Sequence, residues 1–190
     1  MRVIMLAPPG AGKGTQSERI AARYGVPHIS SGDIFREETA AGTPLGKQLR
    51  GYLDSGDLVP DDLVLTLIKG RVIAAARESG GYVLDGFPRT LAQAEAAAAI
   101  GRETKTSAQA VVYLDAAPEV LIARIAGRGE DRADDSTEVA RHRLDVYTEH
   151  TKPLIDYYTG RGIVIKIDAA APIGAVSQEI FAALDPLADA

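Results

Sequence analysis

The chain has 190 residues, of which 46 % are hydrophobic, so it is long enough to form one compact domain with a buried core. Its net charge of −5 argues against nucleic acid or an anionic membrane as a partner. It contains no cysteine, which excludes disulfides, thiol catalysis and thiolate zinc sites. Because it also lacks a signal-peptide pattern and an apolar run of membrane-spanning length, we expect a cytoplasmic protein.

Short apolar runs alternate with helical stretches along the chain. They cover residues 3–6, 82–84, 110–114 and 163–167. Alternation of this kind predicts a parallel sheet with helices on both faces. Ligands bind such sheets beyond the carboxyl ends of the strands, where the segments at residues 7–14 and 85–89 are expected to lie.

The segment LAPPGAGKGTQ, residues 6–16, follows the first of these strands. Glycines alternate at positions 10, 12 and 14 before a predicted helix, a pattern that lets backbone N–H groups converge on a phosphate. The segment departs from G-x-x-x-x-G-K-[ST] at Ala7 and Gly14. We expect Ala7 to end the strand with a negative φ, because its Cβ is then harmless.

Several motifs occur in order over nearly the whole chain: PPGAGKGTQ, then SSGD at residues 30–33, GDLVPD at 56–61, LDGFPRT at 84–90, RADD at 132–135 and PLIDYY at 153–158. This series resembles the adenylate kinases and related nucleoside monophosphate kinases, in which Gly-Thr after the lysine is the usual spelling. The resemblance implies an α/β fold of the P-loop NTPase type, with a five-stranded parallel sheet flanked by helices. It also implies a core of residues 1–29, 60–126 and 138–190, a small helical monophosphate-binding insertion at 30–59, and a short lid at 127–137.

The activity implied by this resemblance is reversible phosphoryl transfer from Mg²⁺-ATP to AMP, giving two ADP. The residues implied to bind ATP are Gly10, Ala11, Gly12, Lys13, Gly14, Thr15, Arg128 and Ala171. Those implied to bind AMP are Ser31, Arg36, Asp57, Leu58, Val59, Gly86, Phe87, Pro88, Arg89, Gln93, Arg132 and Arg143. The catalytic cations are implied to be Lys13, Arg89, Arg124, Arg128, Arg132 and Arg143. Arginine suits this chemistry because its planar fork pairs with phosphate oxygens.

Two carboxylates are candidates for organising the magnesium ion. Asp85 follows an apolar strand, and Asp33 is the last residue of the SSGD motif. Both are expected to act through Mg²⁺-bound water rather than as direct ligands. Asp61 and Asp62 after Pro60 have the position of helix-start or turn residues. The three histidines show no metal or base spacing. The expected partners are ATP, AMP and ADP, with Mg²⁺ and without zinc, on a monomeric protein.

The sequence leaves three other functions to weigh. A UMP/CMP kinase is the nearest, although a hydroxyl at Ser31 and an amide at Gln93 favour AMP. A GTPase-like switch would need an N-K-x-D motif, and the chain has no asparagine. An inactive scaffold is supported only by Ala7.

Overall fold

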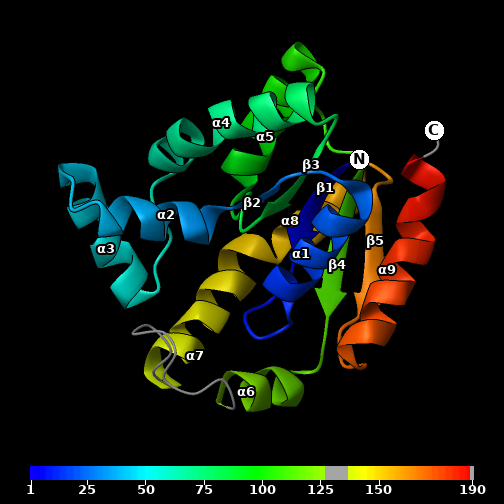
Figure 1. The fold of residues 1–190 in the computed structure, drawn as a ribbon. Helices are drawn as coiled ribbons and strands as arrows, with labels where there is room; N and C mark the ends of the chain where they lie inside the picture. Colours follow the sequence, from blue (N-terminus) through cyan, green and yellow to red (C-terminus); the bar gives the residue numbers. More distant parts are fainter. Residues whose placement is uncertain (127–136, 189–190) are drawn as a thin grey trace.

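The computed structural model describes residues 1–126 and 137–188, and its centre is a five-stranded parallel sheet in the order β2-β3-β1-β4-β5 (Figure 1). The strands are β1 (Arg2–Leu6), β2 (His28–Ser30), β3 (Tyr82–Asp85), β4 (Ala110–Asp115) and β5 (Val164–Asp168). The expected fold class is therefore confirmed. Only β2 was missed, because a three-residue strand with a single buried apolar side chain, Ile29, carries no readable periodicity.

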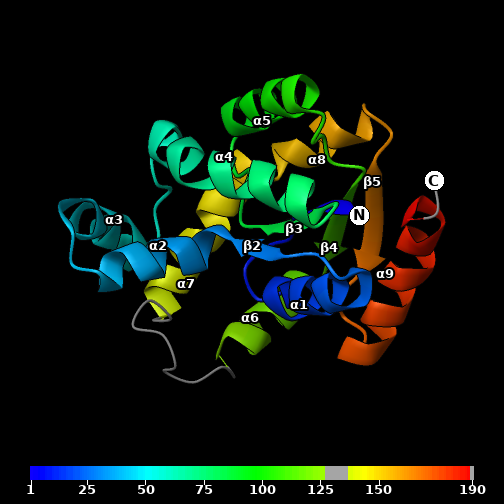
Figure 2. The same cartoon turned by 45° about the horizontal axis from the view of Figure 1, so that its top comes forward.

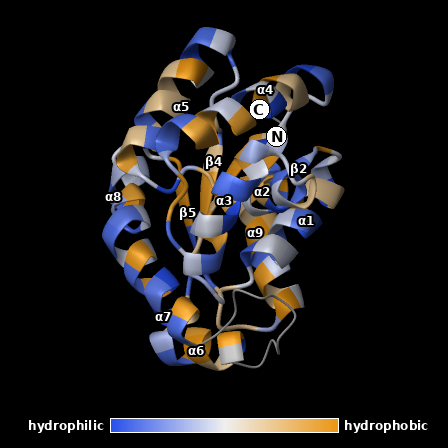
Figure 3. Cartoon of the chain, turned by 90° about the vertical axis from the view of Figure 1, so that its left-hand side faces the viewer, coloured by the Kyte–Doolittle hydropathy of each residue, from blue (hydrophilic) through white to orange (hydrophobic). Residues whose placement is uncertain are grey.

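Helices cover both faces of the sheet, because the side chains of each buried strand point alternately to opposite faces. In β1, Val3 and Met5 belong to the cluster packed under α1 (Lys13–Tyr24), α6 (Pro118–Ala126) and α9 (Ile173–Ala188). Ile4 and Leu6 belong to the opposite cluster, under α4 (Asp61–Glu78), α5 (Leu91–Thr104) and α8 (Pro153–Thr159). Figure 2 shows these two layers on either side of the strands, and Figure 3 shows the hydrophobic character of β4 and β5 between them.

Two further helices, α2 (Ser31–Ala40) and α3 (Pro44–Ser55), lie beside one another to the side of the sheet (Figure 1). They approach closely at Gly46, where a Cβ would lie 2.1 Å from the backbone oxygen of Glu38. Thr43 caps α3 by accepting a hydrogen bond from the Gly46 N–H at 3.0 Å. These helices fall within the insertion expected at residues 30–59.

From Thr137, the last residue of the predicted lid, the chain forms α7 (Thr137–Val146), one π-helical turn η1 (Tyr147–Thr151) and then α8. Pro153 explains the wider turn, since a proline ring would clash with the carbonyl four residues earlier in a regular α-helix. The Lys152 N–H accordingly donates to the Tyr147 carbonyl, five residues back, at 2.8 Å. Among the helices that the structure describes, none combines the length and apolar character needed to span a bilayer.

Candidate functional site

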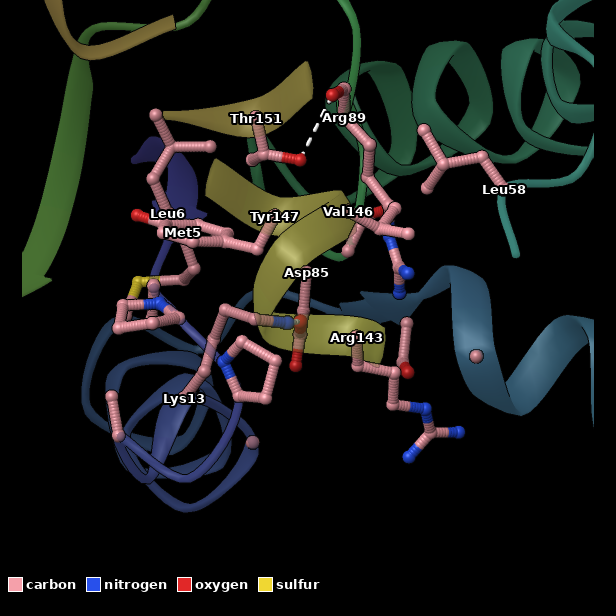
Figure 4. Close-up of a pocket in the computed structure, with 18 of the residues that line it drawn as sticks. Met5, Leu6, Lys13, Leu58, Asp85, Arg89, Arg143, Val146, Tyr147 and Thr151 are labelled. Atoms are coloured by element: carbon pink, nitrogen blue, oxygen red, sulfur yellow. Dashed lines mark hydrogen bonds and ion pairs between the residues drawn. The ribbon is translucent and has the colours of Figure 1, made fainter. Parts of the chain in front are cut away.

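A cleft of about 680 Å³ opens at the carboxyl ends of β1 and β3 (Figure 4). These strands are neighbours in the sheet, yet α1, which follows β1, and α5, which follows β3, pack on opposite faces. The loops after the two strands therefore diverge and leave room between them, as in other open parallel sheets. The sequence places its phosphate-loop pattern after β1 and its GFPR segment after β3, so both line this cleft.

The loop after β1 is shaped by glycines at two positions. Gly10 and Gly12 have φ of 87° and 84°, a region that disfavours side chains. A Cβ at Gly10 would also lie 2.9 Å from the Leu121 carbonyl of α6. Gly12 caps α1 without a side chain, so it leaves the first N–H groups of that helix to a ligand. The predicted residues 10–15 all line the cleft, while Ala7 has no positive φ, as expected.

Lys13 and Asp85 form an ion pair across the base of the cleft, with Lys13 at the start of α1 and Asp85 at the end of β3. Figure 4 shows the two side chains pointing toward one another. His28 of β2 lies on the other side, with Nε2 3.5 Å from Asp85 Oδ2. Burial lowers the pKa of His28 below its usual value, which favours the neutral ring at neutral pH. The base of the cleft thus holds a carboxylate between a cation and a neutral imidazole.

Three of the predicted arginines, Arg36, Arg89 and Arg143, line the same cleft. Arg89 follows β3, and its Nε donates to the Gly86 carbonyl at 2.8 Å, which aims the guanidinium. Burial, and then the charge of Arg36, lower the pKa of Arg89 from its usual value, although arginine stays protonated in proteins. This arrangement concentrates positive charge in a partly buried site, as an anionic ligand requires.

Arg36 is paired with Asp33, the second candidate carboxylate, one turn earlier in α2. Partial burial acts to raise the pKa of Asp33, but hydrogen bonds with Arg36 and Ser30 outweigh it and lower the pKa below its usual value. Both side chains are partly exposed on the cleft wall. Asp33 is therefore ionised at neutral pH, in the form that can hold metal-bound water.

The turn that follows β3 is built around Gly86. Its φ is 78°, and a Cβ there would lie 2.3 Å from Ser31 Oγ. The fully buried Ser31 donates its hydroxyl hydrogen to the Gly86 carbonyl at 2.8 Å, and it is not among the described residues that line the cleft. Ser31 thus fixes the position of the turn that carries Arg89.

Gln93, in the first turn of α5, also reaches the cleft. Its Oε1 accepts from the Arg89 N–H at 2.8 Å, and its Nε2 donates to Asp61 Oδ1 at 2.7 Å. Asp61 therefore does more than begin α4, because its carboxylate joins the start of α4 to the start of α5. This contact joins positions 32 residues apart, so no local sequence pattern predicts it.

The other predicted residues divide into three groups. Asp57, Leu58, Val59 and Pro88 line the cleft, and Asp57 Oδ1 lies 2.7 Å from His142 Nε2 of α7. Phe87 is buried in the core. Arg124 donates hydrogen bonds to the carbonyls of Ala169 and Ala170 at 2.7 and 3.3 Å, and these two residues directly precede Ala171. Neither Arg124 nor Ala171 is among the described residues that line the cleft. Arg128 and Arg132 lie outside the described residues.

The residues of the cleft that the sequence patterns did not single out include His28, Tyr147 and Thr151. Thr151 donates its hydroxyl hydrogen to the Arg89 carbonyl at 2.9 Å, and Figure 4 shows this contact from the π-helical turn. The turn itself could have been suspected from Pro153, since a proline four residues after Glu149 disturbs the helix there. The position of His28 beside Asp85 depends on the pairing of β2 with β3, which the sequence did not reveal.

Comparison with known proteins agrees with this geometry. A profile of the family described as adenylate kinase matches residues 5–163. An adenylate kinase of Stenotrophomonas maltophilia (strain R551-3) is 43 % identical over 186 residues, covering 97 % of this chain and 99 % of the relative. Adenylate kinases of Synechococcus sp. (strain RCC307) and Thermobifida fusca (strain YX) are 46 % and 44 % identical, each covering at least 96 % of this chain and 98 % of the relative. The chain belongs to the adenylate kinase family.

Proposed function

We propose that this protein catalyses the reversible transfer of the γ-phosphoryl group of Mg²⁺-ATP to AMP, giving two ADP. The observation that carries the proposal is that one cleft joins the glycine-rich loop and Lys13 to Arg36, Arg89 and Arg143. Such a cleft offers two anion-binding regions, one at a helix N-terminus and one on arginines. Membership of the adenylate kinase family supports the same reaction.

The two regions suit the two substrates. In this proposal the N–H groups of residues 10–15 and the Lys13 ammonium hold the ATP phosphates, and Arg128 from the lid and Ala171 also contact ATP. AMP lies across the cleft, its phosphate held by Arg36, Arg89, Arg132 and Arg143. Its nucleoside contacts Ser31, residues 57–59 and residues 86–88, and its adenine pairs with Gln93.

The chemistry needs positioning and charge neutralisation more than acid–base catalysis. The attacking atom is an oxygen of the AMP phosphate, which is already ionised, so no side chain has to remove a proton. The bond from the γ-phosphorus to the β–γ bridging oxygen breaks as the new P–O bond forms. The main obstacle is repulsion between two anions, which Lys13, Arg89, Arg143 and, in this proposal, Arg124, Arg128 and Arg132 reduce.

Magnesium suits the carboxylates of the cleft, with Asp85 at its base and Asp33 on its wall. Asp85 has a largely buried side chain, 8 % exposed, which ends β3 and faces the phosphate loop. Among the described residues there is no cluster of three or more His, Cys, Asp or Glu side chains that could hold a metal ion. In this proposal a magnesium ion carried by the ATP phosphates would meet Asp85 and Asp33 through its water ligands. When bound, it offsets charge on the transferring phosphoryl group.

Further parts of the proposal concern organisation. Residues 30–59 form the AMP-binding insertion and residues 127–137 a short lid, on a core of residues 1–29, 60–126 and 138–190. We place the protein in the cytoplasm, where ATP, AMP and ADP are its partners, and we expect a monomer. The paired positions of α2 and α3 beside the cleft support the insertion.

A coupled assay of ADP formation tests the function. With Mg²⁺ and ATP, the purified protein should convert AMP with the stoichiometry of two ADP per AMP. UMP and CMP should be poor acceptors in the same assay. Absence of ADP formation with AMP would refute the proposal, and a preference for UMP or CMP would replace it with the pyrimidine alternative.

A further inference from the structure

The starts of α4 and α5 meet at the wall of the cleft through the side chains of Asp61 and Gln93. Gln93 Nε2 donates to Asp61 Oδ1 at 2.7 Å, and Gln93 Oε1 accepts from the Arg89 N–H at 2.8 Å. Gln93 is only 1 % exposed and lines the cleft. Its amide is therefore held at both ends by the protein, and the described residues make no other hydrogen bond to it.

The two partners determine which way the amide points. A carboxylate can only accept a hydrogen bond and a backbone N–H can only donate one. Rotating the amide by 180° would bring Oε1 against the Asp61 carboxylate and the NH₂ group against the Arg89 N–H. Both hydrogen bonds would then be replaced by repulsive contacts in a buried place, which is costly.

Thr90 keeps the carboxylate in position. Its hydroxyl lies 3.2 Å from both carboxylate oxygens of Asp61. The same hydroxyl accepts a hydrogen bond from the backbone N–H of Gln93 at 3.2 Å. The order of the oxygen and nitrogen atoms on the Gln93 amide is therefore set by Asp61, Thr90 and the Arg89 backbone together.

One N–H and one lone pair remain on the amide for a ligand. The corresponding edge of adenine offers the acceptor N1 and the donor N6, which match them. A 6-oxopurine offers the opposite pair, an N1–H donor and an O6 acceptor. It would fit only an amide turned by 180°, which Asp61 opposes.

We propose that Asp61 is a positioning residue for acceptor specificity. It acts through Gln93, fixing the amide so that the site takes a 6-aminopurine monophosphate and rejects a 6-oxopurine monophosphate. This inference rests on the proposed function, since it needs the AMP base to pair with Gln93.

The test compares AMP with inosine monophosphate, its 6-oxo analogue, as acceptors for ATP. The wild-type protein should prefer AMP by about a hundredfold or more in kcat/KM, because both hydrogen bonds are mismatched in the analogue. Asp61→Asn keeps the size of the side chain, but the new amide can rotate and so can hydrogen-bond to Gln93 in either orientation of the Gln93 amide. It should lower the AMP preference by roughly tenfold or more.

Asp62→Asn is the matched control, because it removes the same charge from the first turn of α4 at an exposed position. It should leave the AMP preference unchanged. A second variant, Gln93→Met, removes the amide, and adding Asp61→Asn to it should then have no effect on the preference.

The outcomes separate the inference from the function on which it rests. If Asp61→Asn lowers the rates with AMP and its analogue equally, Asp61 has a purely structural role and the inference is wrong, while the proposed function stands. Equal use of AMP and inosine monophosphate by the wild type overturns the inference even if the variant does not fold. A wild type that does not convert AMP overturns both.

Discussion

The Lys13 ammonium is paired with the Asp85 carboxylate, which joins the phosphate loop to the end of the neighbouring strand β3. The pairing follows from sheet register, since Met5, near the end of β1, lies opposite Asp85. Without a ligand, the carboxylate holds the ammonium at the base of the cleft. A polyphosphate carries more negative charge than a carboxylate and can therefore draw the Lys13 ammonium away from Asp85. The ion pair thus directs Lys13 into the cleft and neutralises the buried charge of Asp85.

Removal of this cation should therefore reduce catalysis far more than folding. Lys13→Ala is expected to lower kcat/KM for ADP formation by at least about a hundredfold, because a preorganised charge on the transferring group is lost. Circular dichroism and thermal unfolding should show that the fold survives. Lys69→Ala, at an exposed position of α4, serves as the control with near-normal activity. Near-normal turnover by Lys13→Ala would contradict the mechanism.

Asp85 should set the magnesium requirement. Asp85→Asn keeps the shape of the side chain but weakens its hold on metal-bound water, so half-maximal activity should need roughly tenfold more Mg²⁺. A magnesium titration of ADP formation at fixed ATP measures this, and a chelator should abolish the wild-type rate. Asp145→Asn, on the exposed side of α7, is the control. An unchanged magnesium requirement would remove Asp85 from the metal site.

Binding of AMP by Arg89 should depend on the planar geometry of its guanidinium group and not on its charge alone. Its Nε is occupied by the Gly86 carbonyl, so the outer nitrogens are directed as a planar pair. Arg89→Lys keeps the charge but loses this geometry, and the KM for AMP should rise roughly tenfold to a hundredfold. Steady-state kinetics with varied AMP measure the change. Arg141→Lys, at an exposed position of α7, should leave that KM unaltered. An equal effect of the two variants would argue against recognition of AMP by Arg89.

Gly86 should be intolerant of any side chain. Alanine would take up a φ of 78° and place its Cβ 2.3 Å from Ser31 Oγ and 3.2 Å from Arg89 Nη2. We expect Gly86→Ala to lower the free energy of unfolding by about 1–3 kcal/mol, measured by urea titration, and to raise the KM for AMP. Gly70→Ala is the control, since that helical glycine faces open space and alanine there should stabilise by up to about 1 kcal/mol. Unchanged stability of Gly86→Ala would mean that the turn can relax.

The parts of the site that could be predicted from the sequence are those whose geometry is local. A strand, a glycine-rich loop and a helix follow one another within residues 2–24, so the surroundings of Lys13 could be expected from their order alone. The same holds for Gly86 and Arg89, which lie in one turn. Their residue types already indicate positive φ and phosphate recognition.

The contacts that could not be predicted join distant segments. His28 lies beside Asp85 because β2 pairs with β3, and Thr151 reaches the Arg89 carbonyl because a π-helical turn moves it there. Gln93 was expected to face a base, but its bond to Asp61 depends on how α4 and α5 pack. In each case packing of the whole domain, and not local propensity, decides which polar groups meet.

Ala7 stands where the phosphate-loop pattern has a glycine, so its replacement tests whether a glycine is needed there. The residue follows β1 directly, is 7 % exposed and packs in the cluster under α1, without a positive φ. Ala7→Gly should therefore bring no gain in kcat/KM and should cost roughly 0.5–1 kcal/mol of stability, because glycine adds backbone freedom to the unfolded chain. Parallel urea titrations and ADP-formation assays measure both quantities. A several-fold increase in activity would show instead that the Cβ of Ala7 hinders the phosphates, and that the usual glycine serves the ligand and not the backbone.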